Sequence, residues 1–339
     1  MNKESLVKRW PYWLFLFTAV LLGGCEPENT AGKPLKLRMA HVYEVTAPTH
    51  KYGAAFLAER LREKTDDLDI IVYPAAQLGE EDELLEQLVA GELDLAIAGP
   101  SFLGMWHPPI GVFDAAFASR DLDHMLEMAR SDEMATEWDE LLKKYDVRVL
   151  DTWAYGSRHI TSNKPIRHPD DLDGFRLRMP AARIWQASGK ALGASPTPIS
   201  FSEVYLALQQ GIADGQENPV PVIKAKAFHE VQKYLNLTGH IQSSIQILVS
   251  ERKWKRMSPE QQKALLESVR ELGDEVYRGI AADEQKLIEQ WRKDGTMEII
   301  DDVDVDAFRK RCRKHFSSGF AFSELYNRMT AEPTEEETP

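Results

Sequence analysis

Cysteine is scarce in this sequence, because its 339 residues include only Cys25 and Cys312. Two cysteines are too few for a disulfide scaffold, and they make a structural metal site improbable. The nine histidines show no zinc-binding spacing either. We therefore expect a chain that folds around its own hydrophobic core and carries no metal and no cofactor.

Positive charge is also in short supply. The sequence has 41 Lys and Arg residues against 54 Asp and Glu, which gives a formal net charge of −13. A net-acidic chain repels nucleic acids and anionic membrane surfaces, so we expect neither as a partner. With 43% hydrophobic residues the composition is that of a soluble globular protein, and the length predicts two domains.

The common catalytic motifs are absent. The sequence contains no Gly-x-Ser-x-Gly elbow, no His-Glu-x-x-His motif and no Gly-x-x-x-x-Gly-Lys-Ser/Thr phosphate loop. Asp302, Asp304 and Asp306 resemble the start of a calcium loop, but Ala307 and Arg313 stand where that loop requires glycine and glutamate. These absences favour a protein that is not an enzyme, although a catalytic triad can assemble in space rather than in sequence.

An extended hydrophobic run occurs only near the start of the chain. Basic residues precede the apolar run 13–22, which is too short to span a bilayer and is typical of a signal peptide. The sequence Leu-Gly-Gly-Cys at 22–25 resembles a bacterial lipobox. We expect removal of residues 1–24 on export to the periplasm and attachment of a lipid to Cys25, with residues 25–34 as a tether. The alternative is ordinary signal-peptide cleavage and an incidental cysteine.

Strand and helix periodicities alternate along most of the remaining chain. The predicted strands are 35–39, 68–73, 93–98, 147–153, 175–179, 195–198 and 245–249. The predicted helices are 49–64, 79–90, 121–145, 183–192, 202–210 and 259–291. The Gly- and Pro-rich segment 99–118 is predicted to be a loop. This alternation indicates an α/β fold with a mainly parallel sheet, and the helix 259–291 is long enough to span two lobes.

A specific series of motifs follows in the second half of the chain. In order they are Gly156-Ser157-Arg158-His159, Leu177-Arg178-Met179-Pro180, Gly193-Ala194-Ser195-Pro196-Thr197-Pro198, Phe201-Ser202-Glu203-Val204-Tyr205 and Gly215-Gln216-Glu217-Asn218-Pro219. This series resembles the solute receptors of tripartite ATP-independent periplasmic (TRAP) transporters of the DctP type. The order of elements agrees with that family from about residue 35 to residue 323.

The resemblance implies a two-lobed α/β binding protein of the Venus-flytrap type, with a hinge and a long C-terminal helix across both lobes. Lobe I is expected at 35–154 and 244–283, and lobe II at 155–243 and 284–330. The charged segment 331–339 is expected to be a disordered tail.

Arg178 is the strongest candidate for ligand binding. It ends a predicted strand just before Pro180, so its side chain is expected at the carboxyl edge of the sheet, where α/β folds bind ligands. A guanidinium group offers two parallel donors that match a carboxylate. The resemblance implies the same role, with Arg158 assisting. The structural alternatives are a salt bridge for Arg178 and a surface cation for Arg158.

Four further residues are expected around the ligand. The resemblance implies that the Asn218 amide donates to the carboxylate and that Phe201 packs against the apolar face of the ligand. Trp153 and Trp185 are expected to line the cleft. The structural alternatives are a turn before Pro219 for the asparagine and core packing for the aromatic rings.

The resemblance implies a receptor that binds a small organic acid and delivers it to separate membrane permease subunits. A sugar acid such as a uronate, a C4-dicarboxylate and an aromatic acid all remain open. Sialic acid receptors of the family carry an acidic residue where this chain has Gly99-Pro100, which argues against that ligand. The alternatives are a ligand-binding subunit of an ABC permease or signalling receptor, and an exported lyase or isomerase that acts on a hydroxy acid.

Overall fold

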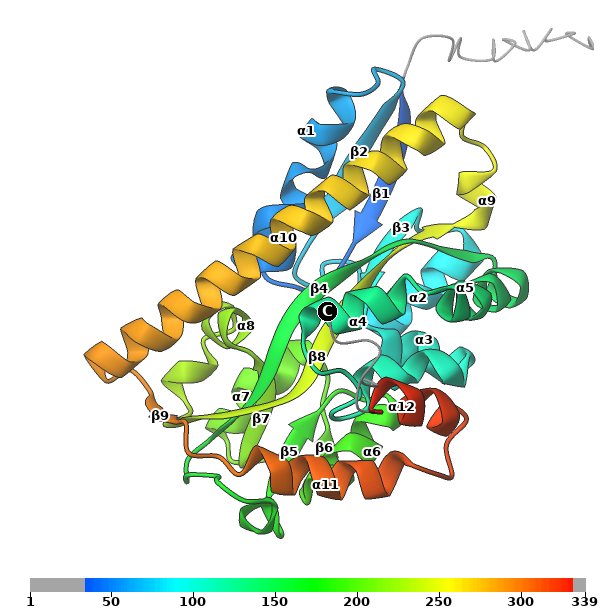
Figure 1. Ribbon diagram of the computed structural model, residues 1–339. Helices are drawn as coiled ribbons and strands as arrows, with labels where there is room; N and C mark the ends of the chain where they lie inside the picture. Colours follow the sequence, from blue (N-terminus) through cyan, green and yellow to red (C-terminus); the bar gives the residue numbers. More distant parts are fainter. Residues whose placement is uncertain (1–33, 332–339) are drawn as a thin grey trace, which may run out of the picture. The chain divides into compact units, whose positions relative to one another are not determined.

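The computed structural model describes residues 34–331, and within them a nine-stranded sheet forms the centre of the fold (Figure 1). The strand order is β2-β1-β3-β8-β4-β7-β5-β6, and β9 pairs with β8 off this path. The strands are β1 (Leu35–Ala40), β2 (Leu68–Tyr73), β3 (Leu95–Ala98), β4 (Val147–Ser162), β5 (Arg176–Met179), β6 (Ser195–Pro198), β7 (Gly215–Pro219), β8 (Tyr234–Ser250) and β9 (Glu298–Ile300).

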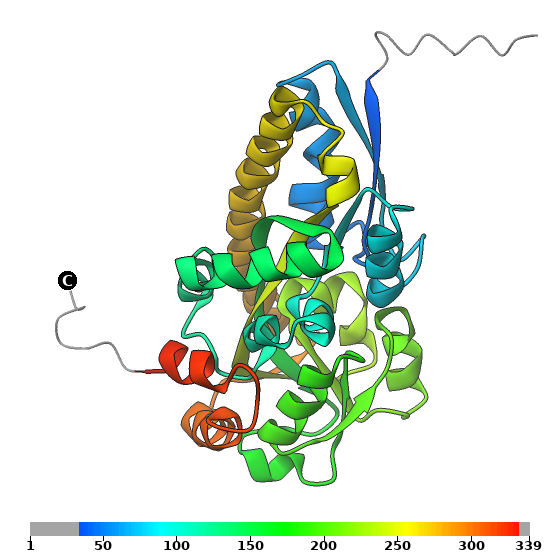
Figure 2. The same cartoon turned by 90° about the vertical axis from the view of Figure 1, so that its right-hand side faces the viewer.

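Helices cover the sheet on both sides, with α10 on one side of the strands and α2 on the other (Figure 2). The α-helices are α1 (Leu57–Arg62), α2 (Glu81–Ala90), α3 (Pro100–Trp106), α4 (Leu122–Ala129), α5 (Asp132–Tyr145), α6 (Arg183–Leu192), α7 (Val204–Gln209), α8 (Val220–Ala225), α9 (Glu251–Trp254), α10 (Pro259–Asp294), α11 (Val305–Phe316) and α12 (Ser323–Met329). Shorter helical turns are η1 (Thr49–Gly53), η2 (Ala54–Phe56), η3 (Pro108–Asp114), η4 (Pro169–Leu172), η5 (Phe201–Glu203) and η6 (Phe228–Glu230). The prediction of an α/β fold is confirmed.

The sheet is mixed rather than mainly parallel, which corrects the prediction. Strands β2, β1 and β3 pair in parallel at one end, and β7, β5 and β6 pair in parallel at the other. Between them β8 and β4 pair antiparallel with each other and with their outer neighbours. Two parallel sets are therefore joined by an antiparallel centre.

The two central strands are much longer than the sequence predicts, because their polar middle residues interrupt the apolar periodicity. Strand β4 pairs with β8 from Val147 to Ser162, with irregularities along the ladder. Gly156 has a φ of +121°, and a Cβ atom there would lie 2.9 Å from Pro219. These strands are the ones that cross between the two predicted lobes, whose boundaries remain a prediction.

Two segments fold differently from the prediction for local reasons. The predicted loop 99–118 contains α3 and η3, and each begins with a proline at its first position, where the missing N–H costs no hydrogen bond. The predicted helix 121–145 is two helices, because the Ser131 hydroxyl accepts a hydrogen bond from the Met134 backbone N–H and starts α5 anew.

Helix α10 spans 36 residues and packs against α1 and η1 as well as against α8 and β9. Its glycines allow close packing, because a Cβ atom at Gly273 would lie 2.8 Å from the Trp153 ring and one at Gly279 would lie 2.2 Å from the Tyr52 ring. The helix thus lies along both parallel sets, as predicted for the long C-terminal helix. Among residues 34–331, no helix combines the length and apolarity needed to cross a membrane.

Some of the predictions concern residues outside the described part of the chain. These are the signal peptide 1–24, the lipid attachment at Cys25, most of the tether and the tail after residue 331. Within the described part, the Cys312 thiol is buried and free.

Candidate functional site

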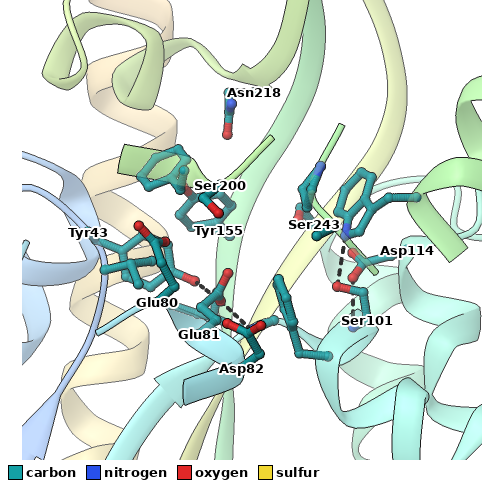
Figure 3. Close-up of a pocket in the computed structure, with 18 of the residues that line it drawn as sticks. Tyr43, Glu80, Glu81, Asp82, Ser101, Asp114, Tyr155, Ser200, Asn218 and Ser243 are labelled. Carbon is teal, nitrogen blue, oxygen red and sulfur yellow. Dashed lines mark hydrogen bonds between the residues drawn. The ribbon is translucent and has the colours of Figure 1, made fainter. Parts of the chain in front are cut away.

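A cavity lies at the carboxyl ends of the parallel strands, where the ligand sites of α/β folds are found (Figure 3). Its walls come from the segments after β1, β3, β5 and β6, from the start of α2, and from strands β4, β7 and β8. The lining residues are Val42, Tyr43, Glu80, Glu81, Asp82, Gly99, Ser101, Phe102, Asp114, Tyr155, Arg158, Arg178, Pro180, Ala181, Trp185, Ile199, Ser200, Phe201, Asn218, Ser243, Ser244 and Ile245.

Arg178 presents to this cavity a positive charge that forms no ion pair within residues 34–331. The residue is 1% exposed, and its Nε and Nη2 atoms donate to the Ile199 carbonyl oxygen at 2.9 and 2.7 Å. Within residues 34–331, its Nη1 atom has no hydrogen-bond partner. Burial lowers the pKa of Arg178 to about 10. Because an isolated buried cation is costly, this geometry favours an anionic group in the cavity.

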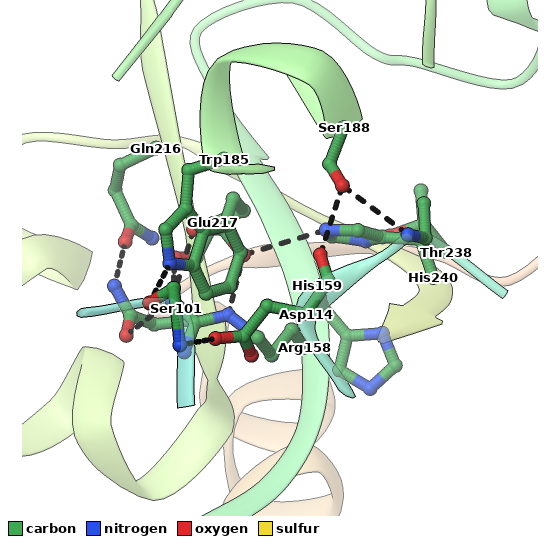
Figure 4. Close-up of polar contacts among 12 residues, drawn as sticks. Ser101, Asp114, Arg158, His159, Trp185, Ser188, Gln216, Glu217, Thr238 and His240 are labelled. Carbon is green, nitrogen blue, oxygen red and sulfur yellow. Dashed lines mark hydrogen bonds and ion pairs between the residues drawn. The ribbon is translucent and has the colours of Figure 1, made fainter. Parts of the chain in front are cut away.

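Arg158 has a different environment, because its charge is already paired (Figure 4). Its Nε atom donates to Glu217 Oε2 at 2.5 Å, and its Nη2 atom donates to Glu217 Oε1 at 2.8 Å. The guanidinium carbon lies 4.6 Å from the centroid of the Trp185 ring. Arg158 therefore borders the cavity as half of a buried ion pair and not as a free cation.

Asn218 also has internal partners. Its Oδ1 atom accepts a hydrogen bond from Arg158 Nη2 at 3.0 Å, and its Nδ2 atom donates to Gln216 Oε1 at 2.6 Å. The amide nitrogen carries a second hydrogen, so the residue keeps one donor beyond the bond to Gln216. The amide oxygen is turned toward Arg158, which orients the amide group within the cavity wall.

The predicted aromatic residues separate into two groups. Phe201 and Trp185 line the cavity together with Tyr155, and the Arg178 guanidinium carbon lies 5.9 Å from the Phe201 centroid. Trp153 is not brought to the cavity, which corrects the expectation for that residue. Its Nε1 atom donates to the Val269 carbonyl oxygen of α10 at 2.9 Å.

A strand irregularity explains why Trp153 and Tyr155 differ. Side chains two residues apart on a regular strand share a face, so both rings would point the same way. The pairing of β4 with β8 shifts register between Ala154 and Gly156, however, and such a bulge changes the direction of the side chains that follow it. Trp153 consequently packs under α10 while Tyr155 lines the cavity.

Two carboxyl groups of the cavity wall that the sequence does not predict have strongly raised pKa values. Glu81 Oε1 accepts hydrogen bonds from the Tyr43 hydroxyl at 3.1 Å and from the Gly99 N–H at 2.8 Å. Asp114 Oδ2 accepts one from the Ser101 N–H at 2.9 Å. Burial raises the pKa of each group to about 7. Nothing in the sequence distinguishes these residues from the many exposed acids, because the enclosure that raises their pKa is created by the fold.

The raised pKa of Glu81 makes a testable prediction about stability. Since the pKa is about 7 in the folded protein and ordinarily 4.5, this group stabilises the fold fully below about pH 4.5 and loses that contribution as the pH rises through 7. Glu81→Gln mimics the protonated form at every pH. We expect the free energy of unfolding of this variant, relative to wild type, to rise by up to about 3 kcal/mol between about pH 4.5 and 7.5.

Urea denaturation of both proteins at the two pH values measures this difference. Taking the difference cancels the other titrating groups, such as His41, whose pKa burial lowers to about 3. A difference that stays constant with pH would show that the pKa of Glu81 is the same in the folded and the unfolded protein, which would contradict the effect of burial.

Comparison with known proteins gives a family match, a sequence relative and two similar structures. The family described as bacterial extracellular solute-binding protein, family 7, matches residues 39–321. The sialic acid-binding periplasmic protein SiaP of Vibrio cholerae is 37% identical over 279 residues, covering 82% of this chain and 86% of that protein.

Two solved structures have similar folds. A TRAP periplasmic solute-binding protein of Roseobacter denitrificans with bound 3-deoxy-D-manno-oct-2-ulosonic acid (KDO) has a TM-score of 0.82 and 28% identity, covering 88% of this chain and 99% of its own. A second protein from that organism, with bound L-galactonate, has a TM-score of 0.81 and 30% identity, covering 87% and 98%.

Proposed function

The chain belongs to family 7 of the bacterial extracellular solute-binding proteins, and we propose that it is a TRAP receptor that binds a sugar acid by its carboxylate group. Proteins of this family bind solutes rather than transform them, so the expectation that the chain is not an enzyme is confirmed. The alternatives of an ABC permease subunit, a signalling receptor and a hydroxy-acid lyase gain no support from the comparisons.

The observation that carries the proposal is the free Nη1 atom of Arg178. A carboxylate that accepts a hydrogen bond from Nη1 would compensate a buried charge that the described residues leave unpaired. Phe201 lies beside the same guanidinium group and offers an apolar surface for the carbon chain of the acid.

The other charges in the cavity favour a ligand with a single carboxylate. Glu80, Glu81, Asp82 and Asp114 all line the cavity, whereas Arg158 is already paired with Glu217. A second carboxylate would meet these acids without a free cation, and hydroxyl groups would instead donate to them. A sugar acid therefore fits better than a C4-dicarboxylate. The acids bound in the two similar structures, KDO and L-galactonate, support this choice.

A thermal-shift screen tests the function directly. Because a ligand that binds the folded state raises the melting temperature by mass action, L-galactonate, KDO, galacturonate, sialic acid and succinate can be compared at equal concentration. We expect stabilisation by at least one sugar acid and none by succinate. Stabilisation by succinate alone would contradict the proposal. NMR spectra of the incubated acid distinguish binding from turnover, because a receptor returns the acid unchanged.

We also propose that the two predicted lobes close over the acid. Lys226 Nζ lies 2.9 Å from Glu44 Oε1, and the Ser202 hydroxyl donates to Glu80 Oε1. Each contact joins a residue of predicted lobe I to one of predicted lobe II. Closure would present the loaded receptor to separate membrane permease subunits.

Attachment to the membrane through Cys25 remains part of the proposal, together with a periplasmic location. The lipobox-like sequence at 22–25 supports it. Mass spectrometry of the N-terminal peptide from cell membranes would detect a diacylglyceryl group on this cysteine. Cys25→Ser should move the protein to the soluble fraction, and an unchanged distribution would contradict lipid attachment.

Trp153→Phe tests the boundary of the site. This substitution removes the donor to the Val269 carbonyl oxygen and part of a fully buried ring. We expect the free energy of unfolding to fall by about 1 to 3 kcal/mol. Sugar-acid affinity should change by less than about twofold, because the ring has no contact with the cavity. Trp185→Phe is the matched comparison inside the cavity and should weaken binding. Calorimetric titration measures the affinity, and urea denaturation measures the free energy of unfolding. A large loss of affinity for Trp153→Phe would show that this residue belongs to the binding site.

A further inference from the structure

Asp114 contributes a carboxyl group to the cavity wall. Binding of the ligand carboxylate at Arg178 does not involve this group. The residue is 1% exposed and ends η3. Its Oδ2 atom accepts a hydrogen bond from the Ser101 N–H at 2.9 Å, and its backbone oxygen accepts one from the Ser188 hydroxyl at 2.8 Å. Ser101 is itself fixed, because its hydroxyl accepts a hydrogen bond from Trp185 Nε1 at 2.7 Å. The carboxyl group is therefore held in one orientation.

The second oxygen of this group, Oδ1, is buried and has no hydrogen-bond partner among residues 34–331. Among the residues that line the cavity, Arg178 also has a buried polar atom without a hydrogen-bond partner in the described part of the chain, its Nη1 atom. One of these atoms is a donor and the other an acceptor. A buried polar atom without a partner is costly, so both atoms point to complementary groups on one ligand.

Asp114 lies away from the other acids of the cavity. Figure 3 shows Asp114 and Ser101 on one side of the cavity and Tyr43, Glu80 and Glu81 on the other. On the Asp114 side, Arg158 is occupied by Glu217 and Asn218. Its Nε and Nη2 atoms are therefore occupied, and the buried carboxyl oxygen without a partner among the described residues on this side, Asp114 Oδ1, is an acceptor.

We propose that Asp114 is a specificity-determining residue whose Oδ1 atom accepts a hydrogen bond from a hydroxyl group on the carbon chain of the bound acid. This inference rests on the proposed function and adds the place where the acid must carry a donor. A ligand whose carbon chain carries no hydroxyl group would leave Asp114 Oδ1 unpaired. A dicarboxylate would place its second carboxylate against the Asp114 carboxyl group. The site therefore selects hydroxylated monocarboxylates over both simple fatty acids and dicarboxylates.

Asp114→Asn provides the test, because it reverses the hydrogen-bonding character of one atom without changing the shape of the side chain. The Ser101 N–H still requires an acceptor, so the asparagine oxygen takes the Oδ2 position and the NH2 group replaces Oδ1. Three six-carbon acids serve as probes. Two are hexanoate and galactarate, and the third is whichever hexonate binds most tightly in a panel that includes L-galactonate. Calorimetric titration measures the affinity of each for both proteins.

Wild type should bind the hexonate at least about 10-fold more tightly than hexanoate, which has no hydroxyl group to donate to Oδ1. The same margin is expected over galactarate, because its second carboxylate brings a further negative charge among the acids of the cavity. Asp114→Asn should weaken the hexonate about 10- to 100-fold and change hexanoate by less than about 3-fold. The affinity for galactarate should fall less than the affinity for the hexonate, since the variant removes a negative charge that repels the second carboxylate of galactarate.

Asp139→Asn is the control for loss of a carboxylate, because this residue is exposed and does not line the cavity. It should change hexonate affinity by less than about 3-fold. If Asp114→Asn weakens hexonate and hexanoate equally, or neither, the role of Asp114 is refuted while the receptor function stands. If no carboxylate binds the wild-type protein, the proposed function fails and this inference fails with it. An unchanged melting temperature for Asp114→Asn shows that the fold is intact.

Discussion

Arg178→Lys is expected to weaken sugar-acid binding by about 100-fold while leaving the fold intact. The guanidinium group holds the Ile199 carbonyl oxygen with Nε and Nη2 and leaves Nη1 for the ligand. An ammonium group has no planar fork, so it cannot bind both the backbone oxygen and a carboxylate in this geometry. Burial without an acidic partner also favours the neutral form of a lysine, which removes the charge that attracts the acid. Calorimetric titration with L-galactonate measures the loss.

Arg176→Lys is the matched control, because Arg176 lies two residues earlier on the same strand and its side chain is exposed and paired with Asp214. It should change neither the affinity nor the melting temperature appreciably. Equal affinities of wild type and Arg178→Lys would show that the acid is anchored elsewhere. An equal loss in both variants would point to a general effect of altering β5.

The position of Arg178 could be predicted because short-range features determine it. The apolar alternation of 175–179 identifies a strand, and Pro180 ends it, so the last arginine must lie at the edge of the sheet. The structure pairs Arg178 with Thr197 of β6 and Gln216 of β7, which places its side chain at the cavity formed by the parallel set. The family resemblance and the strand pattern agree at this residue.

The environment of Arg158 could not be predicted, because it depends on a pairing between distant strands. Arg158 lies opposite Pro219 in the β4–β7 ladder, which brings the Glu217 side chain within reach of the guanidinium group. Polar residues in the middle of a strand normally argue against a buried strand. The polar residues in the middle of these strands are buried because they form hydrogen bonds with one another. Their polarity is also the reason why the strands predicted at 147–153 and 245–249 were too short.

The role of Asp114 was hidden for a related reason. It lies in the segment 99–118, which has no apolar period and was predicted to be a loop. Its burial arises from α3 and α6, through Ser101 and Ser188, and neither contact has a local signal in the sequence. The sequence therefore indicates the residue proposed to bind the ligand carboxylate better than the residue proposed to recognise the rest of the ligand.

Glu217→Gln is expected to cause the largest loss of stability among the variants considered, about 3 to 5 kcal/mol in the free energy of unfolding. Burial alone would raise the pKa of Glu217, but Arg158 and the nearby His240 ring, whose Nε2 atom lies 3.4 Å from Glu217 Oε2, outweigh burial and hold the pKa below its ordinary value. Glutamine keeps the volume of the side chain and removes only the charge. The buried Arg158 guanidinium then loses its ion-pair partner, and leaving one partner of a buried pair uncompensated is more costly than losing an exposed pair.

Asp214→Asn supplies the comparison that isolates burial. It breaks the Arg176–Asp214 pair, whose closest N–O distance of 2.5 Å equals that of the Arg158–Glu217 pair but whose side chains are 49% and 34% exposed. Its expected cost is below about 1 kcal/mol, because water solvates the charge that remains. Urea denaturation of both variants at neutral pH measures the two losses. Equal small losses would mean that water reaches Arg158, and the cavity would then be too polar for Arg178 to bind an acid by charge alone. A large loss for Glu217→Gln alone means that the site excludes water, as tight binding of a carboxylate by one free guanidinium group requires.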